Sequence, residues 1–167
     1  MSVSITSTKT TCKISLSRIN PELGPDLKCR IYLNNKQLDT FAISTPRDLQ
    51  YTINVDDGDN YLDVEHYDRH NRNTETDANN NVLRTSMILI KDIKIHDVKF
   101  YATSIHSYNK FLPAYDDAYL EWARMNQPGK NFPEEMKASP EIGLNGKFRL
   151  HFKWPLYLHA LYHTKLY

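Results

Sequence analysis

Apolar and polar residues alternate one for one along several stretches of the first hundred residues of this 167-residue chain. In residues 49–55 every second position is apolar: Leu49, Tyr51, Ile53 and Val55. A period of two places successive side chains on opposite faces of a strand, so the pattern predicts strands with one buried face. Such stretches recur about every 8–12 residues through position 100, a spacing typical of an antiparallel sandwich or barrel.

Turn signals separate the expected strands. Asn34 and Asn35 predict a two-residue hairpin turn, because asparagine tolerates the positive φ angles that such turns need. The acidic run 56–60 lies between two alternating stretches and predicts a second hairpin with this run at its tip. The strand-like runs 61–67 and 84–95 flank a polar loop, and we expect them to form a hairpin-like pair in the core.

One helix is expected, over residues 114–126, because Pro113 precedes acidic residues that favour a helix N-terminus. Tyr115, Tyr119 and Trp122 follow at i, i+4 and i+7 and share one face of it. We expect this aromatic row to dock on the sandwich, with a ligand platform as the alternative.

After the helix, residues 127–143 contain several prolines and predict an irregular arm that could contact neighbouring molecules. Asn145-Gly146 is the strongest turn signal, and the alternating strand that follows should be interrupted at Pro155. The predicted fold class is all-β: an antiparallel jelly-roll-like β-sandwich with one short helix and a partly irregular C-terminal segment. We expect residues 1–167 to form a single domain.

Composition argues against several classes of protein. The 21 basic and 20 acidic residues give a net charge of +1, so no global field attracts nucleic acid or an anionic membrane. The sequence contains no apolar run of about 18 residues, so it predicts no transmembrane helix, and no signal-peptide pattern is visible at the N-terminus. Cys12 and Cys29 lack the paired spacing of a zinc site and are expected as core thiols, with a disulfide open if their strands pair.

Catalytic motifs are missing from the sequence. It contains no Gly-x-Ser-x-Gly, no phosphate-binding glycine loop and no His-Glu-x-x-His. The remaining candidate for a hydrolase is the group Glu65, His66 and Asp68. We therefore predict a non-catalytic protein and keep a glycan hydrolase as an alternative.

Oxygen-bearing side chains in the acidic turn are of the type that Ca²⁺ prefers. Asp57 and Asp59 lie in this turn, and further oxygens would have to come from Asp63, Glu65 or Asp77. Histidine and aromatic residues near the expected loops form a candidate ligand or contact surface. Its members are His66, Tyr67, His70, Tyr115, Tyr119 and Trp154.

Three segments together resemble the calcium-dependent xylan-binding modules. They are Leu62-Asp63-Val64-Glu65-His66-Tyr67, the loop segment Thr74 to Asp77, and the strand-like run Arg84 to Ile95. In virion proteins of tailed bacteriophages, particularly cyanophages, a similar unit precedes an Asn-Gly turn and a strand ending in aromatic-Pro-hydrophobic-Tyr. Residues 145–157 resemble that closing signature.

This resemblance implies a jelly-roll sandwich with a non-catalytic role in the virion, as a tail, neck or capsid-surface component. It implies a calcium ion bound by Asp77 with Asp57 and Asp59, and coordination of sugar hydroxyls by that ion. The expected partners are other virion proteins in an oligomer, contacted through the irregular arm and both termini, and a glycan on the host surface. The alternative is a free calcium-dependent carbohydrate-binding module.

Overall fold

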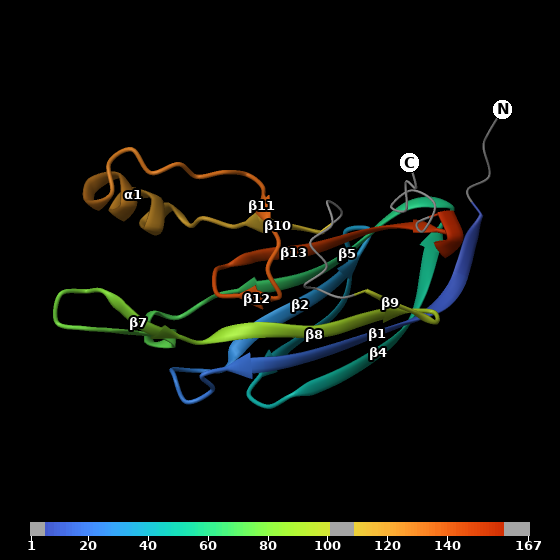
Figure 1. Ribbon diagram of the computed structural model, residues 1–167, viewed down its shortest axis with the longest axis horizontal. Coiled ribbons are helices and arrows are strands. Elements are labelled where there is room, and N and C mark those ends of the chain that lie inside the picture. The colour runs from blue at the N-terminus through green and yellow to red at the C-terminus, as the bar shows by residue number, and fades with distance from the viewer. Residues whose placement is uncertain (1–5, 101–108, 159–167) are drawn as a thin grey trace, which may run out of the picture.

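The computed structural model describes residues 6–100 and 109–158, and it shows two antiparallel β-sheets packed face to face (Figure 1). Among these residues the first sheet has five strands in the order β12-β8-β1-β4, with β9 also paired to β8. They are β1 (Ser7–Ile19), β4 (Arg47–Asp56), β8 (Met87–Ile95), β9 (Val98–Phe100) and β12 (Glu141–Ile142).

The second sheet has six strands within the described part of the chain, in the order β11-β10-β13-β5-β2-β3. They are β2 (Leu27–Leu33), β3 (Lys36–Ile43), β5 (Gly58–Tyr67), β10 (Asn109–Pro113), β11 (Met136–Lys137) and β13 (Gly146–Trp154). This architecture confirms the predicted all-β, antiparallel, jelly-roll-like sandwich with one short helix.

Two projections extend from one end of the sandwich (Figure 1). One is the hairpin of β6 (Thr74–Thr76) and β7 (Val82–Thr85), preceded by the 3-10 helix η1 (Asn71–Asn73). The other carries α1 (Asp117–Asn126), which begins after the N-cap residue Asp116 rather than at residue 114. None of the helices in the described residues is long and apolar enough to cross a membrane.

The core lies between the sheets and explains the alternation in the sequence. On β1, Cys12, Ile14 and Leu16 are buried, and on β13 Phe148 and Phe152 are buried in the same hydrophobic cluster. Each such side chain contributes about 1.5–3 kcal/mol by leaving water. Cys12 and Cys29 are free, buried thiols on strands of different sheets, so the expectation of core thiols is confirmed.

Two expected hairpins are wrong. Strand β4 pairs with β1, whereas β5 pairs with β2 and β13, so the acidic turn carries the chain from one sheet to the other. The run 61–67 and the run 84–95 likewise lie in opposite sheets, because β8 pairs with β1. Alternation shows which residues face the core, but it does not show which strands are hydrogen-bonded neighbours in a sheet.

The predicted turn at Asn34-Asn35 and the predicted strand interruption at Pro155 are confirmed. Asn34 and Asn35 both have positive φ, at 48° and 66°, and join β2 to β3 as expected. Strand β13 ends at Trp154, immediately before Pro155. Within the arm 127–143, however, β11 pairs with β10 and β12 pairs with β8, so its second half is attached to both sheets. The chain termini, expected to contact neighbours, lie outside the described residues.

The crossing between the sheets is held by Asn60, whose side chain is fully buried. Its Oδ1 accepts hydrogen bonds from Asn34 Nδ2 at 2.9 Å and from the Asp56 amide at 3.0 Å. Its Nδ2 donates to the carbonyl oxygens of Asp56 at 2.8 Å and Gly58 at 3.1 Å. All its polar capacity is therefore used to close the turn.

We expect Asn60→Ala to lower the free energy of unfolding by about 2–3 kcal/mol, because it leaves buried backbone groups without partners. Asn54→Ala is the matched control, since Asn54 is exposed on β4 and should change stability by less than about 0.5 kcal/mol. Urea denaturation of the three proteins measures the difference. Equal effects of the two substitutions would contradict the role given to Asn60.

Candidate functional site

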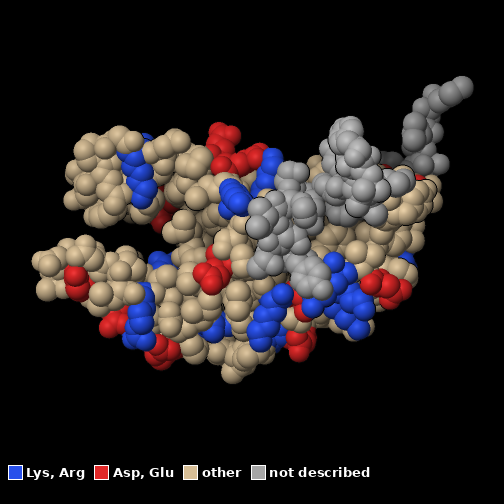
Figure 2. Space-filling model, viewed as in Figure 1, with Lys and Arg blue, Asp and Glu red and all other residues tan. Residues whose placement is uncertain are grey.

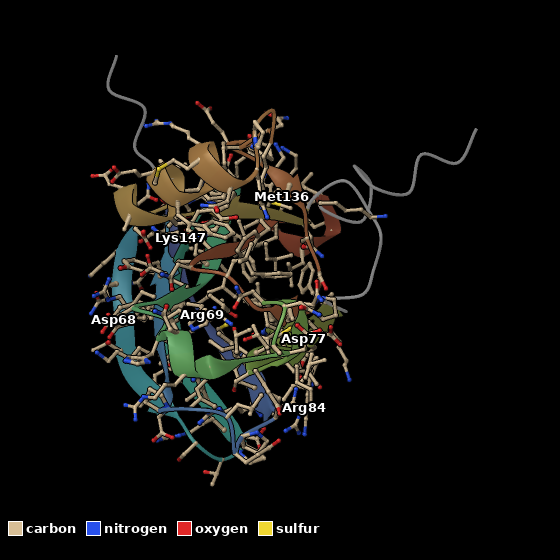
Figure 3. All side chains as sticks on the ribbon, turned by 90° about the vertical axis from the view of Figure 1, so that its left-hand side faces the viewer. Asp68, Arg69, Asp77, Arg84, Met136 and Lys147 are labelled. Carbon is tan, nitrogen blue, oxygen red and sulfur yellow. The ribbon has the colours of Figure 1, made fainter. Side chains whose placement is uncertain are left out.

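The three predicted calcium ligands lie in two separate places. Asp57 lies in the β4–β5 turn and Asp59 at the start of β5, whereas Asp77 lies in the tip of the β6–β7 hairpin at the opposite end of the sandwich (Figures 1 and 3). In residues 6–100 and 109–158 no three His, Cys, Asp or Glu side chains are grouped as a metal site would require. The three carboxylates therefore do not form a common site.

Asp59 and Asp77 both have local partners. The Asp59 carboxylate is 2.6 Å from Lys153 Nζ and 2.6 Å from His151 Nε2, and these contacts lower its pKa. Asp77 Oδ2 accepts a hydrogen bond from the Asn81 side chain, and its Oδ1 accepts from the amides of Asn81 and Asn79. These bonds hold the hairpin tip and lower the pKa of Asp77.

Four residues of the predicted contact surface lie in different places. His66 is a residue of β5 whose side chain is fully buried. Its neighbour Tyr67 lies on the outer face, with the Arg30 guanidinium carbon 3.6 Å from its ring centroid. His70 lies in the loop, where its Nδ1 accepts a hydrogen bond from the Arg72 amide and caps η1. Trp154 is at the far end of β13, partly buried against the core. The structure does not bring these residues together.

The aromatic row of α1 does not dock on the sandwich, contrary to the preferred expectation. Trp122 is 48% exposed, and α1 stands away from both sheets (Figure 1). The rings of Tyr115 and Tyr119 are nearly parallel, with centroids 6.1 Å apart, and Trp122 continues the row at 6.1 Å from Tyr119. Phe132 supports the row through edge contacts with both tyrosines. This arrangement agrees with the alternative, a ligand platform.

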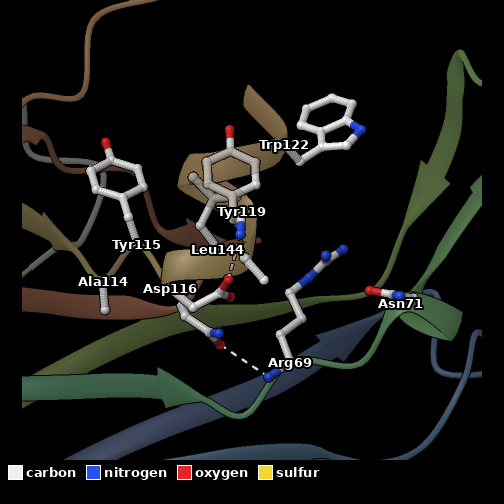
Figure 4. Close-up of a pocket in the computed structure, with 10 residues that line it drawn as sticks. Arg69, Asn71, Ala114, Tyr115, Asp116, Tyr119, Trp122 and Leu144 are labelled. Atoms are coloured by element: carbon white, nitrogen blue, oxygen red, sulfur yellow. Dashed lines mark hydrogen bonds between the residues drawn. The ribbon is translucent and has the colours of Figure 1, made fainter. Parts of the chain in front are cut away.

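The aromatic row forms one wall of a cleft of about 540 Å³. Figure 2 shows the hollow between the two projections, and Figure 4 shows the side chains that line it. The opposite side and the floor come from the loop after β5 and from the turn before β13. The lining residues are Arg69, Asn71, Ala114, Tyr115, Asp116, Ala118, Tyr119, Trp122, Leu144 and Asn145.

Arg69 is the basic residue of the cleft. Its amide donates to Asn145 Oδ1 at 3.1 Å, and its Nη2 donates to the hydroxyls of Thr74 and Thr85 at the base of the hairpin. Its Nε is buried and has no hydrogen-bond partner, and burial lowers the pKa of the guanidinium. In Figure 4 the end of the side chain points toward Trp122.

The polar loop that carries Arg69 is anchored by Asn73. The Asn73 side chain is buried and donates to the carbonyl oxygens of Leu23 at 3.0 Å and Pro25 at 2.8 Å. Its Oδ1 accepts a hydrogen bond from the His70 amide at 3.0 Å. The segment was predicted as a polar loop, but Asn73 within it is a buried structural residue. The sequence offered no signal that separated Asn73 from its exposed neighbours.

The fold and the cleft together define a β-sandwich protein with an aromatic, polar-rimmed cleft. Comparison with solved structures finds two similar chains. One is described as vCBM60 in complex with galactobiose, at a TM-score of 0.45 and 8% identity, over 84% of this chain and 96% of that one.

The other is a selenomethionine form of vCBM60, from work on a circular permutation linking two families of calcium-dependent carbohydrate-binding modules. Its TM-score is 0.48 and its identity 9%, over 84% of this chain and 89% of that one. No protein-family model and no curated protein matches the sequence. At these TM-scores and identities the likeness transfers no site, so the function must be inferred from the residues of the cleft.

His66 lies behind the turn that lines the cleft, and neither of its ring nitrogens has a hydrogen-bond partner. Burial, reinforced by the Arg69 cation, lowers the pKa of His66 to about 4, and the main chain at Leu144 and Ile142 opposes the shift. Above the ordinary pKa of 6.5 the imidazole is neutral in both the folded and the unfolded chain. Below that pH the unfolded chain binds a proton that the folded chain does not, so stability falls.

We therefore expect the protonation of His66 in the unfolded chain to lower the free energy of unfolding by about 2 kcal/mol when the pH falls from 7 to 5. His66→Met should remove this part of the pH dependence, whereas His70→Gln should retain it because His70 is exposed. Urea titrations at several pH values in this interval measure the slopes. A parental slope that persists in His66→Met would contradict the assignment.

Proposed function

We propose that this chain is a non-catalytic glycan-binding module and that its ligand occupies the cleft beside α1. The observation that carries the proposal is the row of Tyr115, Tyr119 and Trp122, partly open to solvent and facing polar groups across the cleft. The C–H faces of a sugar ring pack against aromatic rings, while its hydroxyls bond to polar side chains. The cleft supplies both kinds of contact.

The polar side of the cleft suits hydroxyl recognition. Asn71 and Asn145 bring amide groups to the rim, Asp116 brings a carboxylate, and Arg69 brings the donors of a guanidinium. Amides and carboxylates bond hydroxyl groups in fixed directions, so they favour one orientation of a ring stacked on Tyr119 or Trp122. The volume of about 540 Å³ is within the range of about 300–1,000 Å³ found for small-ligand pockets.

Several placements support a binding role over a hydrolytic one. Glycoside hydrolysis ordinarily uses two carboxyl groups flanking the bond, whereas Asp116 is the one carboxylate among the described residues that line the cleft. Asp116 Oδ1 accepts a hydrogen bond from the Tyr119 amide at 2.7 Å and thereby caps α1. The group Glu65, His66 and Asp68 is dispersed: Glu65 contacts Arg30 and Tyr32 on the outer face, His66 is inside, and Asp68 pairs with Lys28.

The expected place in a virion, with other virion proteins as partners and an oligomeric state, stays a prediction from the resemblance. A glycan-binding cleft on a projecting end would serve host-surface contact in such a particle and would serve equally well in a free module.

Replacing Trp122 tests the cleft as the binding site. We expect Trp122→Ala to weaken binding of a recognised glycan at least about tenfold, or about 1.4 kcal/mol, because an exposed indole is a typical hot spot. Met125→Ala is the matched control, since Met125 is 71% exposed on the same helix and does not line the cleft. A glycan array identifies the ligand, and titration calorimetry measures both variants. Equal losses in the two variants would place the site elsewhere.

Calcium removal gives an independent test. None of Asp57, Asp59 and Asp77 lines the cleft, so we expect glycan affinity to change by less than about twofold after EDTA treatment. Titration calorimetry with and without added Ca²⁺ measures this. Binding that is lost in EDTA and restored by Ca²⁺ would show that the ion contributes to the site, contrary to this expectation.

A further inference from the structure

Arg69 differs from the other buried or half-buried arginines of the described residues in having no acidic partner. Arg47, Arg72 and Arg124 also lack one, but their side chains are exposed. Arg18 contacts Asp26 at 3.2 Å, and Arg149 makes two bonds to the buried Asp63, at 2.8 Å and 2.7 Å. Arg84 bonds Glu22 and Glu75 on the surface. Across residues 6–100 and 109–158, no carboxylate forms an ion pair with Arg69.

This isolation is costly because Arg69 has lost part of its hydration. Its Nε is inaccessible and makes no hydrogen bond, and only Nη2 donates to neighbours, both of them neutral threonine hydroxyls. A partly buried cation without an anion is unfavourable unless an anion arrives from outside. In Figure 4 the guanidinium end of the side chain points into the cleft, toward Trp122.

The other charges around the cleft also favour an acidic ligand. Lys130 does not line the cleft, but its Nζ donates to the Tyr119 hydroxyl at 2.8 Å and lies 5.4 Å from the centroid of the Tyr119 ring, so a second cation lies beside the aromatic row. Asp116 is the opposing charge, but its Oδ1 is committed to the N-terminus of α1 and no bond joins it to Arg69. The N-terminus of α1 further offsets the Asp116 charge.

We propose that the cleft binds a glycan containing uronic acid, with the sugar carboxylate on Arg69 and the sugar ring on Tyr119 and Trp122. This inference rests on the proposed glycan-binding function and specifies its ligand class. A uronic acid carries a carboxylate and the C–H faces of its ring on one sugar unit, and Arg69, Tyr119 and Trp122 line the same cleft. Charge-assisted bonds from arginine to carboxylate are also about twice as strong as neutral ones.

The test compares each acidic polymer with its own neutral form. Polygalacturonate, alginate, glucuronoxylan and hyaluronate are presented beside the same polymers after chemical reduction of their carboxyl groups. We expect at least one acidic polymer to bind at least tenfold more tightly than its reduced form, as measured by titration calorimetry. Trp122→Ala should weaken binding to both forms, since stacking does not depend on the carboxylate.

Substitution of Arg69 isolates the charge. Arg69→Gln should weaken binding to the acidic polymer at least tenfold more than it weakens binding to the reduced polymer. Arg72→Gln is the matched control, because it removes the same charge from an exposed position in the same loop, outside the lining of the cleft. Arg69→Lys, which keeps the charge, should recover part of the affinity. Thermal unfolding of each variant shows whether the hairpin anchored at Thr74 and Thr85 is retained.

The outcomes separate the two proposals. If acidic and reduced polymers bind equally and Trp122→Ala weakens both, the glycan-binding function stands and the uronate inference is overturned. If Arg72→Gln weakens acidic binding as much as Arg69→Gln, or dextran sulfate binds as tightly as the uronate, attraction is by net charge alone and the inference is also overturned. If no polymer binds in either form, the uronate inference is overturned, and the glycan-binding function fails as well if no glycan on the array binds.

Discussion

The cleft depends on a buried polar contact between two loops that are about fifty residues apart in the sequence. Asn73 of η1 donates to two carbonyl oxygens of the β1–β2 loop. From the other side, Arg18 donates to Ser86 Oγ at 2.7 Å and to the Leu23 carbonyl at 2.7 Å. Gly24 completes the contact, since its φ is +70° and a Cβ there would lie 2.6 Å from the Arg72 carbonyl. This packing fixes the loop that carries Arg69 and the hairpin beyond it.

A second constraint is the way the chain passes between the sheets. The acidic turn crosses at one end, where Asn60 satisfies the backbone of the turn. The segment containing β11 and β12 crosses near the other end, pairing first with β10 and then with β8. It leads directly into Leu144 and Asn145 of the cleft. The floor of the cleft is therefore tied to both sheets, whereas its aromatic wall is carried on a separate projection (Figure 1).

The sequence allowed the fold class and many strand boundaries to be predicted, because alternation and turn residues are local properties. The Asn34-Asn35 turn and the end of β13 before Pro155 are examples. Strand partners were not predictable in the same way. Strands β4 and β5 are adjacent in sequence and both alternate, yet they belong to different sheets. The crossing between the two strands is held by the buried side chain of Asn60. In the sequence, Asn60 is one more residue of an acidic turn.

The candidate site was predictable only in part, for a related reason. The i, i+4, i+7 spacing correctly grouped Tyr115, Tyr119 and Trp122 into one row, although Tyr115 precedes α1. Spacing cannot show whether such a row meets a sheet or solvent. The carboxylates chosen as calcium ligands were acidic residues in turns, where such side chains also bond their own backbone. Asp77 does so. Arg69 carries no distinguishing pattern, because its isolation from carboxylates is a property of the folded chain.

The aromatic wall keeps its shape without support from the sandwich. Asp116 caps the first turn of α1, the three rings stack in sequence, and Phe132 packs edge-on against two of them. Ala123 of α1 is fully buried, and Lys130 bonds both the Tyr119 hydroxyl and Gln127. Because these contacts order the rings before any ligand is bound, little conformational entropy remains to be lost on binding. If the aromatic wall docked on the sheet, its rings would bury more apolar surface but would no longer be open to a ligand. The exposure of Trp122 is the energetic cost of leaving the rings open.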